Sequence, residues 1–196
     1  MRPFPRVALS LLCLAALVAP AAAQEQMIGF EKIQQLLAGG QARLAARELQ
    51  LASVAFRSEI GRCRDEEIGA RLVELEPRFS SLAERVQAGA ITTAALEQEF
   101  VAMDRLLAEN HLKLAVTGWG LRRFGRLEAV ANDLRLAALY LDRSAKWTAQ
   151  PLPPDLRQAV DGALAAAEQL AKSPANPPGA TGAAIEAFDK AMKLPR

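Results

Sequence analysis

His111 is the residue of this chain best suited to bind a metal or a haem iron. It is the only histidine, and it lies on an apolar helical face between Leu107 and Leu114. A haem bound inside a bundle needs its second axial ligand from another helix, whereas Met103 lies about 12 Å away along the same face. The absence of Cys-x-x-Cys-His excludes covalent haem attachment. We predict a hydrogen-bonded core histidine, with binding of haem or another small molecule near His111 as the alternative.

Other metal sites and catalytic triads lack the residues that they require. Structural zinc needs four Cys or His ligands, and a hydrolytic triad needs a nucleophile, a base and an orienting acid. The chain has one histidine, two cysteines and no Gly-x-Ser-x-Gly sequence. The adjacent carboxylates of Asp65, Glu66 and Glu67 point in different directions around a helix, which is typical of a solvated face. We predict no cofactor, no metal site and no enzymatic activity.

Cys63 is a second candidate for chemistry. Cys13 falls within a segment that we predict to be removed, so Cys63 has no partner for an intramolecular disulfide. Its place on the apolar face that begins at Ala45 favours a small buried side chain. Arg62 and Arg64 flank it and would favour the thiolate if the side chain were exposed. The alternative is therefore a free thiol that links two copies, or one copy and a partner.

The stretch from Trp119 to Arg126 combines tryptophan with arginines. Near the free N–H groups of a helix N-terminus, the guanidinium groups of Arg122, Arg123 and Arg126 would bind a carboxylate or phosphate. Tryptophan and arginine are also enriched at protein–protein interfaces. We predict that Trp119 closes the end of the bundle, with an interface and an anion site as alternatives. The candidate partner-binding residues are thus Trp119, Arg122, Arg123, Arg126 and Cys63.

The N-terminus has the organisation of a Sec-type signal peptide. Arg2 and Arg6 precede an apolar run from Val7 to Val18, and residues 21–23 supply the alanines of a cleavage site. The run is too short to cross about 30 Å of hydrocarbon as a helix. We predict that residues 1–23 are cleaved and that residues 24–196 form one domain. The protein is then periplasmic or secreted, with no stable membrane insertion.

The charge balance limits the class of partner. The two arginines of the predicted signal account for the formal net charge of +2, so residues 24–196 are neutral overall. Nucleic-acid binding depends on a positive surface that contacts phosphates, so we predict no nucleic-acid partner. A hydrophobic fraction of 51% allows a core that needs no disulfide.

Apolar residues recur at intervals of three and four along most of the remaining chain. This spacing predicts amphipathic helices, and we find no alternating pattern typical of strands. The clearest apolar faces are Ala45-Leu49-Ala52-Phe56-Ile60-Cys63, Ile68-Leu72-Leu75-Phe79-Leu82-Val86, Leu96-Phe100-Met103-Leu107-His111-Leu114 and Phe124-Leu127-Ala131-Leu134-Ala138-Leu141-Ala145.

Local signals predict where these helices begin. We expect a short first helix from about Gln26 to Ala38, ended by a pair of glycines. Thr92 or Thr93 is expected to cap a later helix by accepting a hydrogen bond from a free N–H group. Asp155 is expected to cap the fifth long helix.

Two sequence features predict interruptions. Proline clashes with the preceding helical turn, so we expect a kink or a restart at Pro77. The two glycines in residues 117–120 are expected to break the helix that carries His111, because each costs about 1 kcal/mol in a helix interior.

Together these patterns predict an all-α protein: an antiparallel bundle of four to five long helices with short accessory helices. A helical-repeat protein is the alternative, but no fixed period is present. By elimination, the sequence favours an exported, non-enzymatic bundle that acts as a binding, adaptor or assembly component. We expect its partner to be another protein or a second copy of itself.

Overall fold

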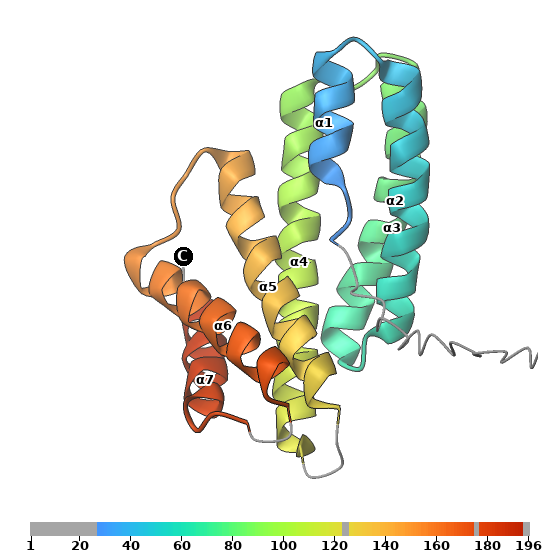
Figure 1. The fold of residues 1–196 in the computed structure, drawn as a ribbon. Helices are drawn as coiled ribbons and strands as arrows, with labels where there is room; N and C mark the ends of the chain where they lie inside the picture. Colours follow the sequence, from blue (N-terminus) through green and yellow to red (C-terminus); the bar gives the residue numbers. More distant parts are fainter. Residues whose placement is uncertain (1–26, 123–125, 175–176, 194–196) are drawn as a thin grey trace, which may run out of the picture.

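The computed structural model describes residues 27–122, 126–174 and 177–193. Within these ranges the regular elements are all α-helices, and no strand is present (Figure 1). The predicted signal peptide, residues 1–23, lies outside them. The helices are α1 (Phe30–Ala38), α2 (Ala42–Arg62), α3 (Glu66–Gln87), α4 (Thr93–Gly120), α5 (Leu127–Thr148), α6 (Pro154–Lys172) and α7 (Ala180–Met192).

The arrangement of the helices confirms the predicted all-α antiparallel bundle. Helices α2 to α6 are long, with 19 to 28 residues each, whereas α1 and α7 have 9 and 13. Consecutive helices pack as the pairs α2–α3, α4–α5 and α6–α7, and α4 and α5 share the most extensive contact. The α6–α7 pair lies on one side of α4–α5, and α2–α3 lies on the other (Figure 1). No helix in the described ranges is long and apolar enough to cross a membrane.

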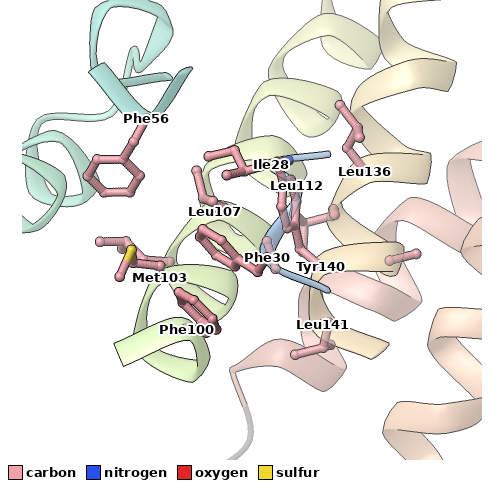
Figure 2. Close-up of a cluster of buried hydrophobic side chains, with 14 of the residues drawn as sticks. Ile28, Phe30, Phe56, Phe100, Met103, Leu107, Leu112, Leu136, Tyr140 and Leu141 are labelled. Carbon is pink, nitrogen blue, oxygen red and sulfur yellow. The ribbon is translucent and has the colours of Figure 1, made fainter. Parts of the chain in front are cut away.

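Aromatic side chains join α1 to the helices on both sides of it. Phe30 of α1 stacks on Phe100 of α4, with ring centroids 4.3 Å apart, and meets Phe79 of α3 edge-on at 5.6 Å. Phe56 of α2 meets the same Phe79 edge-on at 5.3 Å. Figure 2 shows the rings of Phe30 and Phe100 next to each other, with Phe56 to one side. Each such pair contributes about 0.5–1.5 kcal/mol beyond area burial, so α1 links the α2–α3 pair to α4.

The observed helix starts correct two predicted boundaries. Helix α1 begins at Phe30 rather than near Gln26, because the backbone of Ile28 is bonded to side chains of α5 instead of to a helical turn. Helix α6 begins at Pro154, and Asp155 lies in its first turn without acting as the cap. A proline at the first helical position has its φ already fixed for the helix, so the cap moves from Asp155 to Pro153, two residues earlier.

Thr92 caps α4 as predicted. Its Oγ1 accepts a hydrogen bond of 3.2 Å from the Ala95 N–H. Asp65 caps α3 in the same way, because its Oδ1 accepts a hydrogen bond of 3.1 Å from the Ile68 N–H. Both caps fix the entry into helices that carry much of the core.

Helix α3 is continuous through Pro77, so the predicted restart does not occur. Pro77 itself is exposed, whereas Leu72 and Phe79 on either side of it are fully buried. Because both halves of the helix are held against the same core, their packing outweighs the cost of about 3 kcal/mol that an interior proline imposes.

The predicted interruption occurs at the end of residues 117–120 and not at Gly118: α4 runs through Gly118, ends at Gly120, and α5 begins at Leu127. A Cβ at Gly118 would lie 2.7 Å from Cγ2 of Val130 on α5. At Gly118, α5 thus approaches α4 too closely to leave room for a side chain, and the packing that this allows offsets the low helix propensity of glycine.

The Gly118→Ala substitution is expected to destabilise the protein by about 1–3 kcal/mol, because the added methyl group overlaps Val130. Urea denaturation measures the effect. The matched control is Gly162→Ala in α6, where a Cβ has no neighbour within 4 Å and the better helix propensity should stabilise by about 0.5–1 kcal/mol. Equal effects of the two substitutions would contradict the close approach of α4 and α5.

Candidate functional site

His111 is a fully buried residue that lies next to a cluster of charged side chains. Its own exposed fraction is 0%. Its Nδ1 is 2.9 Å from Oδ1 of Asp133 on α5, and its Nε2 is 3.4 Å from Oε2 of Glu59 on α2. The ring stacks on Tyr140, with centroids 5.6 Å apart and planes inclined by 13°. Nδ1 of His111 thus forms a hydrogen bond with one carboxylate, Nε2 lies close to a second carboxylate without a hydrogen bond, and one face of the ring contacts an aromatic ring.

Arg62 joins the two carboxylates from the other side. One guanidinium nitrogen is 3.2 Å from Oδ1 of Asp133, and another is 3.4 Å from Oε1 of Glu59. The charges of both acids are therefore offset locally, as a cluster of this burial requires. The cluster ties α2, α4 and α5 together.

Arg143 and Asp104 form a second buried pair next to this cluster. Two nitrogens of Arg143 donate to the two oxygens of Asp104 at 2.9 and 2.6 Å, and Trp147 Nε1 donates to the same carboxylate at 2.8 Å. The third nitrogen of Arg143 donates to the carbonyl of Ile28 at 2.6 Å and to Glu31 at 2.9 Å. Such bidentate, charge-assisted pairs are the strong class of protein hydrogen bonds.

Tyr140 connects the two groups of charged residues. Its ring stacks on His111 on one side, and the guanidinium of Arg143 lies 5.2 Å from the ring centroid. Its hydroxyl accepts a hydrogen bond of 3.1 Å from the Ile28 N–H, and Figure 2 shows Ile28 and Tyr140 side by side. Burial raises the pKa of Tyr140, so the phenol is neutral at neutral pH.

The buried network orients helices and presents no reactive group to solvent. His111, Asp104 and Tyr140 are all at most 1% exposed. Both nitrogens of His111 face carboxylates, so neither is open to an iron atom in this arrangement. Over the described part of the chain, no three His, Cys, Asp or Glu side chains are placed to hold a metal ion. The geometry therefore favours a structural role for the network.

The titration of Asp104 gives this network a testable pH dependence. Burial raises the pKa of this carboxyl to about 6, against the opposing hydrogen bonds from Arg143 and Trp147, whereas its ordinary value is 3.8. Between these values the folded protein binds a proton that the unfolded chain does not. The stabilising contribution is thus fully present below pH 3.8 and is lost as the pH rises through 6.

We expect the free energy of unfolding of the wild type, relative to that of Asp104→Asn, to fall by about 3 kcal/mol between pH 3.8 and pH 7. Chemical denaturation of both proteins across this range measures the difference. A relative stability that rises toward neutral pH would show that burial does not dominate the titration of this carboxyl.

Trp119 lies at the C-terminal end of α4 rather than at a helix N-terminus. It is partly buried against the core, and a Cβ at Gly182 of α7 would lie 3.0 Å from its Nε1. The guanidinium of Arg122 lies 5.0 Å from the ring centroid and donates a hydrogen bond of 3.1 Å to the Trp119 carbonyl. Trp119 therefore packs α7 against α4, and Arg122 bonds to the electronegative end of the helix.

The three arginines of this stretch do not share one described site. Arg126 is exposed, precedes α5 directly and has a left-handed backbone with φ of 77°. Arg123 lies outside the described residues, as does Phe124. An anion site that uses all three guanidinium groups stays a prediction from the sequence.

Cys63 follows the last residue of α2 and is half-buried. Its thiol donates a hydrogen bond of 3.2 Å to the carbonyl of Asp65, and a Cβ at Gly69 would lie 3.7 Å from its sulfur. The side chain thus lies in the turn between α2 and α3. It contacts no other candidate partner-binding residue.

A surface groove between α6 and α7 is the main feature that the sequence did not indicate. It is open to solvent and has a volume of about 800 Å³. Charged and polar side chains line its edges: Asp155, Gln158 and Asp161 on α6, and Lys190 on α7. The rest of its lining consists of small residues, namely Ala159, Gly162, Ala183, Ala184, Ala187 and Ala191.

The fold and these features define an all-α helical-bundle protein with a buried polar network and a surface groove. Comparison with models of protein families, with curated proteins and with solved structures finds no match to this chain. The functional proposal therefore depends on the geometry of this chain alone.

Proposed function

We propose that this protein is a non-enzymatic binding or assembly component, exported through its N-terminal signal, whose binding surface is the α6–α7 groove. The observation that carries the proposal is the groove itself: about 800 Å³ of open space lined largely by alanine and glycine. Such a concave apolar surface accepts the large apolar side chains of a partner. The charged side chains at its edges supply orientation and specificity.

Gly162 supports this use of the groove. It lies within α6, where glycine costs about 0.5–1 kcal/mol relative to alanine. A Cβ at this position has no neighbour within 4 Å, so packing inside the protein does not require a glycine. Gly118 contrasts with it, since there the neighbouring helix fills the space. A partner that approaches α6 closely would explain why residue 162 is a glycine, which packing within the isolated chain does not.

The alternative, a haem or another small molecule bound near His111, receives less support from the geometry. The ligand would have to displace Asp133 or Glu59 from the ring nitrogens and open a side chain that is 0% exposed. An absorption spectrum of protein isolated from haem-replete cells tests this alternative. A Soret band that disappears in His111→Leu would favour it over the groove.

Site-specific photo-crosslinking tests the proposed surface. A photoreactive amino acid at Gln158, an exposed residue of the groove, is expected to give a discrete crosslinked product in cells that make the protein. The same amino acid at Val73, which is 58% exposed on α3, is the control and should not give that product. Absence of a product at Gln158, or the same product at both positions, would argue against the groove.

A further inference from the structure

Helix α2 has an apolar ridge on the face that points away from the core. The ridge consists of Leu44, Leu51 and Val54, which are 49%, 59% and 59% exposed. At 3.6 residues per turn these three side chains lie on one side of the helix, opposite the buried face of Leu49 and Phe56. No helix of the described chain covers this ridge, although it spans about 15 Å.

The two flanks of the ridge differ in charge. In the helical projection Arg43 and Arg47 lie on either side of Val54, and Glu48 lies beyond Leu44 and Leu51. Arg43 and Arg47 are exposed and form no ion pair with any residue that the structure describes. Glu48 is held by Lys32 at 2.7 Å, a pair in which the lysine is 62% exposed. The ridge is thus convex and apolar, with two exposed arginines on one side and the Lys32–Glu48 ion pair on the other.

The α6–α7 groove has the complementary shape and the complementary order of charges. Asp155 and Asp161 of α6 and Lys190 of α7 line it, and Asp161 also lies 3.9 Å from Arg157. The lining residues span about two helical turns on each helix, roughly 10–12 Å, which matches the distance from Leu44 to Leu51. A lining of alanine and glycine leaves room for leucine and valine. When Arg43 and Arg47 lie over the α6 edge, Glu48 faces Lys190.

We propose that the α2 ridge of one copy of this chain docks into the α6–α7 groove of a second copy. Helix α2 and the α6–α7 pair lie on opposite sides of α4–α5 (Figure 1), so one copy cannot place its own ridge in its own groove. The contact is heterologous, because it uses different surfaces on the two copies, and it propagates into a ring or a short filament. This inference depends on the proposed function, since it names the occupant of the same groove.

Sedimentation velocity of the purified processed protein tests the contact. The wild type is expected to show a mass that rises with concentration in the micromolar range. Leu51→Asp removes the ridge, and Gly162→Leu fills the groove at a position with free space around it. Each substitution should weaken self-association at least about tenfold, because each lies at the centre of the contact. Val73→Asp is the exposed control and should associate as the wild type does.

A mixture of the two variants provides the sharpest outcome. Leu51→Asp retains its groove and Gly162→Leu retains its ridge, so an equal mixture is expected to form a dimer that does not grow further. Circular dichroism of each variant checks that helical content is unchanged. A wild type that stays monomeric at high concentration, or a mixture that stays monomeric, would overturn the inference.

Crosslinking separates failure of this inference from failure of the proposed function. If the product formed at Gln158 contains a different protein while the purified chain stays monomeric, the groove remains a binding surface and only its occupant is wrong. If neither a crosslinked product nor self-association is found, both proposals fail. A product that contains two copies of the chain supports both.

Discussion

Replacing Arg143 with methionine is expected to destabilise the fold by about 3–5 kcal/mol. The substitution removes both hydrogen bonds to Asp104 and leaves that carboxyl group, at 0% exposure, without its counter-charge, so that it must either stay ionised without a cation or bind a proton. It also removes the donor to the carbonyl of Ile28, which anchors the segment before α1. Urea denaturation at pH 7 measures the loss.

The matched control is Arg157→Met on α6. Arg157 also pairs with an aspartate, Asp142 at 2.7 Å, but its side chain is 41% exposed. Solvent screens such a pair, so the expected loss is below about 1 kcal/mol. A similar loss of stability for Arg143→Met and Arg157→Met would show that burial does not increase the contribution of the Arg143–Asp104 pair to stability.

Replacing His111 with leucine is expected to cost about 2–3 kcal/mol. Leucine fills the space next to Tyr140 but leaves Asp133 and Glu59 facing an apolar side chain, with only Arg62 to offset them. Thermal or urea denaturation measures the loss of stability. The absorption spectrum of the protein should not change, because we expect no haem at His111.

A double-mutant cycle with Asp133→Leu distinguishes a structural pair from two independent contributions. When both residues are replaced, no carboxylate is left facing leucine at this position, and Arg62, which is 33% exposed, can turn to solvent. The double substitution should then cost at least about 1 kcal/mol less than the sum of the single ones. Strict additivity would mean that His111 and Asp133 do not stabilise each other.

The bundle was predictable because apolar spacing reports directly on helices. The faces carried by α2, α3 and α4 hold buried residues at the expected positions, among them Leu49, Leu72 and Phe100. Interruptions were less predictable, since propensity is a local property and packing is not. Pro77 and Gly118 both lie inside continuous helices because tertiary contacts on either side outweigh their local cost.

The partners of the buried charges were not predictable from one sequence. Sequence spacing placed His111 on an apolar face, but Asp133 and Glu59 come from other helices, 22 and 52 positions away in the chain. Asp104 is different, because it lies among apolar residues of α4 that are buried. A charged side chain in such a place needs a partner, so the presence of a buried ion pair could have been predicted. The pairing with Arg143 depends on how α4 and α5 pack.

The groove was unpredictable for a different reason. Its small lining residues come from two helices, and alanine is also the commonest way to allow close packing within a bundle. Only the arrangement of α6 and α7 shows that these small residues face open space. Gly162 was the one residue that could have indicated the groove, because it is a glycine within a helical segment and not near a turn.

The yield of the crosslinked product at Gln158, compared between Gly162→Ala and Gly162→Leu, tests most directly whether the groove is the binding surface. Both substitutions are compatible with α6, because a Cβ at residue 162 meets no neighbour within 4 Å. Only leucine reaches far enough to fill the groove. Binding in the groove predicts that the product persists with alanine and disappears with leucine. An unchanged yield in both variants would contradict it.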